Sequence, residues 1–408
     1  MLSTTIIEEA KKLQAELVGQ RRYLHAHPET AFQLSLTKEF VKAELKSFGY
    51  EPVDCGKSGV TVTVGSGTSG KTFLIRGDMD ALPIREETNL DFASQNGCMH
   101  ACGHDMHTTM LLGAARLLKN HEAEIKGTIK LMFQPAEEVF EGAKDMIQAG
   151  ILENPKVDAA LMIHVMAGMP FASGTAIISA PGVSAPAADF FEIRVNGKGC
   201  HGSMPNTGAD PLVAASHILL GVQEIQTREL ALYENAVLTF GSVHGGTAPN
   251  IIPDSVTMTG SIRTFNEDTR ALIKTRLEEI AKGIATTYRC SAEISFGSGC
   301  PTLVNDKTLC QDTETYLRDL FGSDYVFSAE QLTSMSGSDS QAKTAGSEDF
   351  AYVSQKVPSV MIAMAAGNPQ NGYKYPQHHP KVRFDDEILY LGSALYAYTA
   401  MRWLEEHS

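Results

Sequence analysis

Four short apolar segments, each followed by polar residues, constrain the fold of this chain more than any other feature. They lie at residues 72–76, 129–133, 157–163 and 359–364, and helix-like patterns occur between them. Short, mostly apolar runs of this length are typical of strands that are covered on both faces, as in a sheet flanked by helices. The sequence therefore predicts an open α/β sheet, which would bind ligands at the carboxyl ends of its strands.

The polar residues after these segments are of types that bind metals or move protons. Asp80 follows the first segment, the pair Glu137 and Glu138 follows the second, and His164 ends the third. A loop after the fourth segment carries His378. Neighbouring side chains on extended backbone point in opposite directions, so we expect the two glutamates to have different roles. One sheet would bring all these side chains to the same rim.

The densest cluster of candidate residues is the segment His-Ala-Cys-Gly-His-Asp-Met-His at 100–107. A helix pattern begins there, and Asp105 is its predicted N-cap. Cys102 and His104 would point to different faces of a regular helix, so they can share a metal only on irregular backbone, which Gly103 permits. A buried cysteine beside surface histidines is the alternative interpretation, but the packed combination favours a metal or catalytic site.

A different pattern occupies residues 184–300, after a break near Pro181 and Gly182. Its expected elements follow the order β-α-β-β-α-β, which matches the ferredoxin-like split unit. We therefore expect an inserted domain, with residues 1–183 and 301–408 forming the sheet domain. A glycine-rich turn in the insert carries His201, and a strand carries Arg263. Arg263 could bind a carboxylate through two parallel hydrogen bonds, or could form an ordinary surface salt bridge.

Composition limits the partners and the location of the protein. The chain has 408 residues, 43% of them hydrophobic, and a net charge of −14. This charge argues against nucleic acid or an anionic membrane as a partner, and no apolar run is long enough to span a bilayer. The seven cysteines show no paired spacing, and the N-terminal segment lacks a basic region. We therefore expect a cytoplasmic protein with free thiols.

Taken in order, these motifs closely resemble the M20 metallopeptidase family, in particular its amidohydrolase branch. That branch includes hippurate hydrolases, N-acetyl-amino-acid deacetylases and plant auxin-conjugate hydrolases. The resemblance implies a metallo-exopeptidase-like catalytic domain with a mixed sheet (1–183 and 301–408), and an inserted ferredoxin-like domain that acts as lid and dimerisation domain (184–300). The matching segments are 76–83, 100–104, 134–138, 164–165, 197–205, 250–253, 262–265, 346–350 and 378–380.

The resemblance also implies a chemistry, the hydrolysis of an N-acyl amino acid or small dipeptide by a metal-activated water. Glu137 would be the general base, and Asp80 would orient a ligand. The substrate's carboxylate or the oxyanion would contact His201, Asn250 and Arg263. The family pattern implies a homodimer formed through the inserted domain, and two divalent ions, Zn²⁺ or Mn²⁺ with Co²⁺ also compatible. The implied metal ligands are Cys102, His104, Glu138, His164 and His378.

Two other hypotheses belong to different classes. In the first, Cys102 is the nucleophile of a cysteine hydrolase and His104 is its base, which leaves the other candidate ligands without roles. In the second, the chain is a catalytically inactive carboxylate-binding protein on the same fold, which would have no need of a base at Glu137. Retained activity in a chelator would favour the first hypothesis, and turnover of any N-acyl amino acid would exclude the second.

Overall fold

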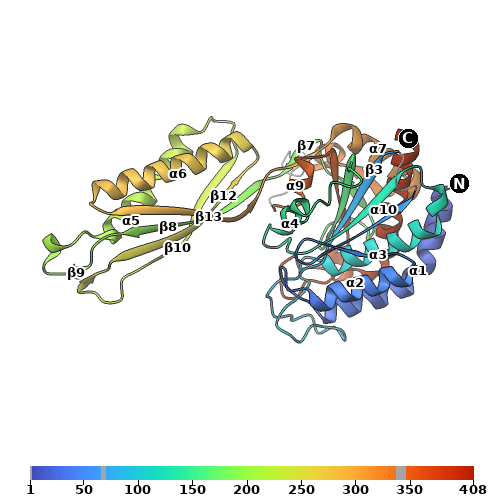
Figure 1. The fold of residues 1–408 in the computed structure, drawn as a ribbon, viewed down its shortest axis with the longest axis horizontal. Helices are drawn as coiled ribbons and strands as arrows, with labels where there is room; N and C mark the ends of the chain where they lie inside the picture. Colours follow the sequence, from blue (N-terminus) through green and yellow to red (C-terminus); the bar gives the residue numbers. More distant parts are fainter. Residues whose placement is uncertain (1, 66–69, 337–345) are drawn as a thin grey trace. The chain divides into compact units, whose positions relative to one another are not determined.

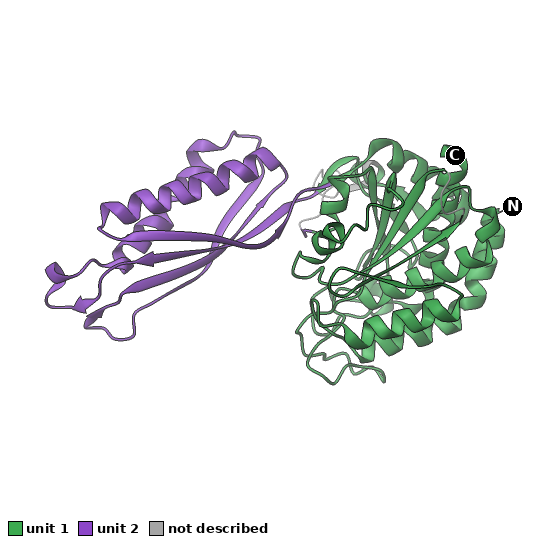
Figure 2. Cartoon of the chain, viewed as in Figure 1, with its two compact units in different colours: residues 1–184, 304–344, 348–408 green, residues 185–303, 345–347 purple. Residues whose placement is uncertain are grey.

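The computed structural model of the protein describes residues 2–65, 70–336 and 346–408. The chain forms two compact units, shown in separate colours in Figure 2. Unit 1 comprises residues 1–184, 304–344 and 348–408, and unit 2 comprises residues 185–303 and 345–347. Unit 2 therefore interrupts unit 1 in sequence. None of the helices in the described residues has the length and apolar character that crossing a membrane requires.

The described part of unit 1 contains an eight-stranded mixed sheet in the order β1-β2-β4-β3-β5-β16-β6-β15 (Figure 1). The four predicted apolar segments are its central strands β4, β3, β5 and β16, which run parallel to one another. β1 and β2 are antiparallel additions at one edge. The bounds are β1 (Val53–Cys55), β2 (Gly59–Gly65), β3 (Thr72–Asp78), β4 (Thr128–Gln134), β5 (Ala159–Met166), β6 (Ala176–Ile178), β15 (Val326–Ser328) and β16 (Ser359–Ala365).

Helices cover both faces of this sheet. On one face α3 and α10 pack against β3, and α1 packs against both helices to close the main apolar core. Two short helices, α4 and α9, pack near β4 and β16 on the other face. The Ser- and Gly-rich composition of residues 334–340 predicts a loop, but residues 334–336 belong to helix α8, and the rest of the stretch lies outside the described residues. The bounds are α1 (Leu2–Ala26), α2 (Ser35–Ser47), α3 (His104–Asn120), α4 (Gly142–Gln148), α7 (Lys307–Phe321), α8 (Ala329–Ser336), α9 (Ala351–Ser354) and α10 (Leu389–His407), with short helical turns at Glu122–Glu124, Ser323–Tyr325, Pro369–Asn371 and Asp386–Ile388.

The order of the central strands creates a topological switch point between β3 and β5. The chain leaves β3 through α3 and enters β4 on one side, then crosses through α4 to β5 on the other side of β3. Open α/β sheets bind ligands in the crevice at the carboxyl ends of two such strands. The pairing of β3 with β5 stops at Arg76 and Met162, although both strands continue beyond these residues. The sheet is therefore open between β3 and β5 at this rim.

The described part of unit 2 is a four-stranded antiparallel sheet in the order β10-β12-β8-β13, with α5 and α6 packed on one face over an apolar core. The sequence pattern predicts a helix over 211–227, but α5 ends at Gly221 and a separate helical turn follows at Ile225–Glu229. A two-stranded ladder joins β9 to β11, and a second ladder joins β7 to β14, whose residues belong mostly to unit 1. The bounds in chain order are β7 (Gly182–Ala185), β8 (Ala187–Asn196), β9 (Cys200–His201), a turn at Pro205–Thr207, α5 (Pro211–Gly221), β10 (Ala236–Gly245), β11 (Ile251–Ile252), β12 (Ser255–Thr264), α6 (Glu267–Thr287), β13 (Ser291–Cys300) and β14 (Leu303–Asn305).

Candidate metal centre

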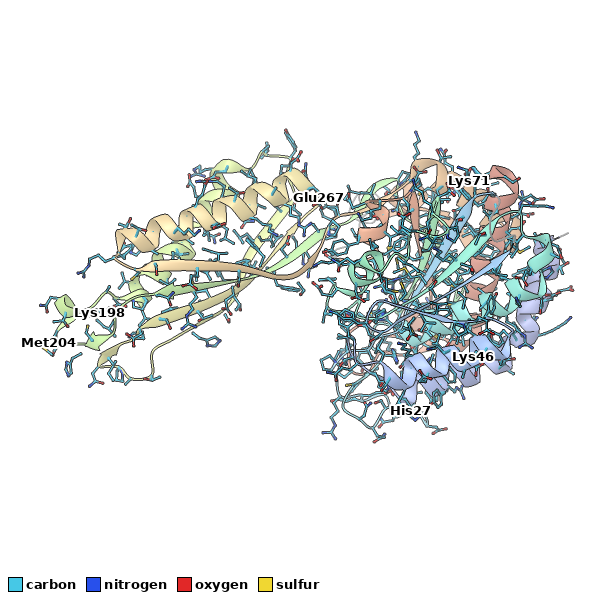
Figure 3. All side chains as sticks on the ribbon, in the orientation of Figure 1. His27, Lys46, Lys71, Lys198, Met204 and Glu267 are labelled. Atoms are coloured by element: carbon cyan, nitrogen blue, oxygen red, sulfur yellow. The ribbon has the colours of Figure 1, made fainter. Side chains whose placement is uncertain are left out.

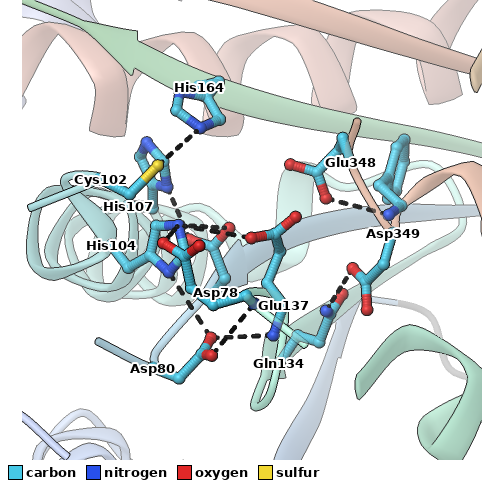
Figure 4. Close-up of polar contacts among 12 residues, drawn as sticks. Asp78, Asp80, Cys102, His104, His107, Gln134, Glu137, His164, Glu348 and Asp349 are labelled. Carbon is cyan, nitrogen blue, oxygen red and sulfur yellow. Dashed lines mark hydrogen bonds and ion pairs between the residues drawn. The ribbon is translucent and has the colours of Figure 1, made fainter. Parts of the chain in front are cut away.

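The rim between β3 and β5 brings together the predicted polar residues of unit 1. Figure 4 labels five of them, namely Asp80, Cys102, His104, Glu137 and His164. The Cys102 Sγ atom lies 3.5 Å from His164 Nε2 and 3.3 Å from His378 Nε2. His378 Nε2 is also 3.6 Å from an oxygen of Glu138. Among the groups of donor atoms that meet within 4.8 Å, two contain the Cys102 thiol, one with His104 and His164 and the other with Glu138 and His378. The thiol belongs to both sets.

The ring of His104 is surrounded by carboxylates. Its Nε2 atom lies 3.6 Å from Asp78, 3.9 Å from Glu137 and 3.8 Å from Glu138, and its Nδ1 atom lies 3.5 Å from Asp80. Both ring nitrogens are buried without a hydrogen-bond partner among the described residues, as is one oxygen of Glu138. A buried polar atom without a partner costs about 1–3 kcal/mol. A coordinated cation would satisfy these atoms, so the donor set fits a metal.

Gly103 produces the irregular backbone that lets Cys102 and His104 face the same space. It has φ +91°, in the left-handed region, and a Cβ atom added to it would lie 2.5 Å from the Val165 side chain. The prediction that Asp105 caps the following helix is wrong. Helix α3 begins at His104 with Gly103 as its cap, and Asp105 lies in the first turn.

Asp80 holds the glutamate pair through the backbone. Its two carboxylate oxygens accept the N–H groups of Glu137 at 2.9 Å and Glu138 at 3.2 Å. His164 lies within β5 rather than at its end, and its Nδ1 atom donates to the Val165 carbonyl oxygen at 2.8 Å. This bond leaves His164 Nε2, which faces Cys102, with a lone pair available for a metal.

Burial opposes the charged forms of these groups. It raises the pKa of the Cys102 thiol well above its ordinary value and raises the pKa of Glu138 to about 7. Burial also raises the pKa of Glu137, and the neighbouring carboxylate of Glu348 acts in the same direction. The pKa of His164 is lowered to about 3 by burial, which favours the neutral imidazole. A bound divalent cation would stabilise the thiolate and the carboxylates, and would therefore lower the pKa values of Cys102, Glu137 and Glu138 again.

Sulfur, nitrogen and oxygen donors in one buried cluster restrict the choice of metal. Thiolate and imidazole suit Zn²⁺, whereas the carboxylate also admits Mn²⁺ or Co²⁺. The residues present therefore fit divalent transition metals better than Ca²⁺ or Mg²⁺, which prefer oxygen ligands alone.

Sequence reasoning assigned no role to the buried ionic network behind the rim. The fully buried Arg76 guanidinium contacts Asp78 at 2.7 Å, Glu348 at 2.8 Å and Asp349 at 3.1 Å. The Gln134 side chain joins this network by donating to Asp349 at 2.6 Å. An arginine inside an otherwise apolar strand is the signal that could have found it, because a buried charge requires partners.

The predicted substrate-binding residues of unit 2 do not all lie together. β9 pairs His201 with Ile251, and the Gly202 N–H donates to the Asn250 carbonyl at 2.8 Å, so the exposed His201 and Asn250 are neighbours. Arg263 lies near the other end of β12 and donates to the Ser347 hydroxyl.

Within one chain, the length of unit 2 separates His201 and Asn250 from Arg263. Figure 3 shows Lys198 and Met204 at one end of unit 2 and Glu267 at the other. Arg263 lies eight positions after Ser255 on β12, which corresponds to about 26 Å of strand at ~3.3 Å per residue. The three predicted residues therefore cannot hold one carboxylate within a single copy of unit 2.

A buried cluster of thiol, imidazole and carboxylate donors, with a second glutamate beside it at a switch point, is typical of metal-dependent hydrolases. Comparisons with known proteins agree. The chain matches the model of Peptidase family M20/M25/M40 over residues 74–402. It is 35% identical over 398 residues to the N-acetylcysteine deacetylase of Bacillus subtilis, covering 97% of this chain and 98% of that protein.

Two further relatives widen the comparison. The chain is 35% identical over 415 residues to the IAA-amino acid hydrolase ILR1-like 2 of Arabidopsis thaliana, covering 99% of this chain and 89% of that protein. The crystal structure of the Bacillus subtilis YXEP protein, a dinuclear metal binding peptidase from the M20 family, matches with a TM-score of 0.76 and 34% identity, covering 97% and 99% of the two chains. The chain belongs to peptidase family M20 and is a metal-binding hydrolase of that family.

Proposed function

We propose that this hydrolase cleaves the amide bond of N-acyl amino acids or small dipeptides by means of two divalent metal ions. The observation that carries the proposal is the pair of donor sets that share the Cys102 thiol, with Glu137 beside them. The names of the relatives support the substrate class, since one is a deacetylase of N-acetylcysteine and another a hydrolase of IAA-amino acids. The proposed ligands are Cys102, His104, Glu138, His164 and His378.

Each proposed role follows from the position of the side chain. Bound divalent ions would lower the pKa of a water molecule and polarise the scissile carbonyl. Glu137, which is buried and close to His104, is the proposed general base that takes the water's proton and returns it to the leaving amine. Asp80 holds the backbone of Glu137 and Glu138 and thereby orients both carboxylates.

Unit 2 is the proposed ferredoxin-like lid and dimerisation domain. The strands of its four-stranded sheet and the two helices follow the order β-α-β-β-α-β, and that sheet is antiparallel throughout. Since His201 and Asn250 lie far along unit 2 from Arg263, we infer that a second copy of the chain completes the substrate site. Co-expression of His201→Ala with Glu137→Gln would then recover activity that neither variant shows alone. Activity that stays at the level of the single variants would contradict this arrangement.

One experiment tests the proposed reaction as a whole. The protein is treated with a chelator, dialysed, and assayed on a panel of N-acyl amino acids with Zn²⁺, Mn²⁺ or Co²⁺ added back. We expect activity to disappear on chelation and to return with one of these ions. Activity that persists in the chelator would favour Cys102 as a nucleophile. No turnover of any substrate, with any ion, would favour a binding protein.

A further inference from the structure

Two side chains fill the opening between β3 and β5 where their backbone pairing stops. The first is Tyr396 of α10, whose hydroxyl donates to the Arg76 carbonyl at 2.6 Å and accepts the Ile163 N–H at 3.0 Å. The second is His107 of α3, which accepts the Val165 N–H at 2.8 Å, closer to the rim. Each side chain therefore replaces a missing strand-to-strand contact.

The bonds of His107 define its tautomer and use both of its nitrogens. Nε2 accepts a hydrogen bond from Val165, so it has no proton. Nδ1 carries the proton and donates it to Asp78, at a distance of 2.6 Å. The side chain is completely buried. His107 is thus a fixed bridge from the end of β3 to β5, and neither nitrogen is available to bind a metal.

This bridge lies between two of the proposed metal ligands. The centre of the His107 ring is 5.4 Å from that of His104 and 4.8 Å from that of His164. Its partners also reach those ligands, because Asp78 lies 3.6 Å from His104 Nε2 and the Val165 carbonyl accepts the Nδ1 proton of His164. Figure 4 shows the ring of His107 in this position. A shift of His107 would therefore be transmitted to both ligands.

The backbone around His107 is held as firmly as its side chain. A Cβ atom added to Gly77 of β3 would lie 2.9 Å from the His107 carbonyl oxygen, so the first turns of α3 lie directly against the strand. The hydroxyl of Thr108 also donates to the Asp78 carbonyl at 2.6 Å. The position of the imidazole is therefore set by the contact of α3 with β3, and not by the metal-binding side chains at the rim.

We propose that His107 is a positioning residue that sets the separation of His104 and His164 at the open rim, a role that rests on the proposed metal centre. Groups that orient metal ligands typically change metal affinity by about 10–100-fold when they are removed. A residue that only joins two strands would instead lower stability and leave the metal affinity unchanged. Tyr396 provides the matched comparison, because it joins the same strands without touching a proposed ligand.

The test compares His107→Leu, His107→Gln and Tyr396→Phe in the full chain. Cobalt affinity is measured by competition with a chelator, the visible absorption of the Co²⁺ protein reports the ligand geometry, and urea unfolding of the metal-free protein reports stability. We expect His107→Leu to weaken Co²⁺ binding by about 10–100-fold and to alter the spectrum. His107→Gln, whose amide can donate and accept, should lose less. Tyr396→Phe should lower stability while keeping the wild-type affinity and spectrum.

Equal losses of Co²⁺ affinity in His107→Leu and Tyr396→Phe would overturn the proposal, as would a wild-type affinity and spectrum in His107→Leu. If the leucine variant does not fold, His107→Gln decides, and affinity and spectrum equal to those of Tyr396→Phe would overturn it. Failure of the proposed metal centre can be told apart from failure of the His107 proposal. If the wild-type protein binds no divalent ion, the metal centre is overturned, and the role of His107 with it.

Discussion

Most candidate residues of unit 1 are buried or half-buried, with His378 as the exposed exception, whereas those at the far end of unit 2 are exposed. Asp80 is 0% and His104 1% exposed, and each is held by packing or hydrogen bonds. His201, at the end of the short strand β9, and Asn250, in the turn before β11, face solvent. The difference shows that unit 1 fixes its donor atoms before any ligand binds, whereas the exposed residues of unit 2 need another surface to become part of a site.

The largest effect that tests this contrast is expected at the glutamate pair. Glu137→Gln should retain metal and lower kcat by about 10²–10⁴-fold, since it removes general acid–base catalysis. Glu138→Gln should lose metal instead, because it removes a proposed ligand. Metal content is measured by elemental analysis and kcat with an N-acyl amino acid. Glu141→Gln, in the same loop, is the control and should change neither quantity. The reverse pattern would mean that the two roles are exchanged.

A smaller effect is expected in unit 2, at Arg263. If this guanidinium binds the substrate's carboxylate, the wild-type enzyme should prefer an N-acyl amino acid over its carboxamide by about 1.5–3 kcal/mol, the strength of a charged hydrogen bond. Arg263→Ala should remove most of that preference, measured as the ratio of the two kcat/KM values. Arg194→Ala, an arginine on β8 of the same sheet, should leave the ratio unchanged. If the wild-type enzyme cleaves both substrates equally well, Arg263 does not bind the substrate's carboxylate and has a structural role instead.

The smallest effect is expected at an exposed charge of unit 1. It tests whether burial, rather than membership of unit 1, determines how much a charged side chain contributes to stability. Hydrogen bonds from Lys42 and Lys38 hold the pKa of the exposed Asp54 below its usual value. The stabilisation is therefore present above the ordinary aspartate pKa and is lost as pH falls through the lowered one. Asp54→Asn should reduce the free energy of unfolding by only about 0.2–1 kcal/mol at pH 7.

Urea unfolding of Asp54→Asn and the wild type checks this expectation. The difference between the two proteins should shrink in acid, because both side chains are then uncharged. If Asp54→Asn lowered the free energy of unfolding at pH 7 by about 3–5 kcal/mol, as expected for a broken buried ion pair, exposed and buried charges would not differ in their contribution to stability.

Apolar pattern and motif order predict the central sheet and the residues at its rim. Strands β3, β4, β5 and β16 are mostly apolar because helices cover both faces, and this signal is local in sequence. The effect of Gly103 was also readable, because two candidate ligands on either side of a glycine require a special backbone conformation. These features depend on short stretches of chain.

Long-range pairing could not be read in the same way. The partners of Arg76 include Glu348 and Asp349, which are more than 270 residues away in sequence. Asp105 was mistaken for a helix cap because its actual partners, Arg21 and His25, come from α1. The role of His107 depends on where the pairing of β3 and β5 stops, which no periodic pattern encodes.

The interruption of unit 1 by unit 2 also has a consequence for folding. The contact of Cys102 with His378 joins residues 276 positions apart, whereas the main part of unit 2 is one continuous segment from 185 to 303. Contacts of high sequence separation form slowly, because a long loop must close first. During synthesis, unit 2 is complete before His378 leaves the ribosome. We therefore expect tight metal capture to be a late event, because an ion that arrives earlier meets an incomplete set of donors.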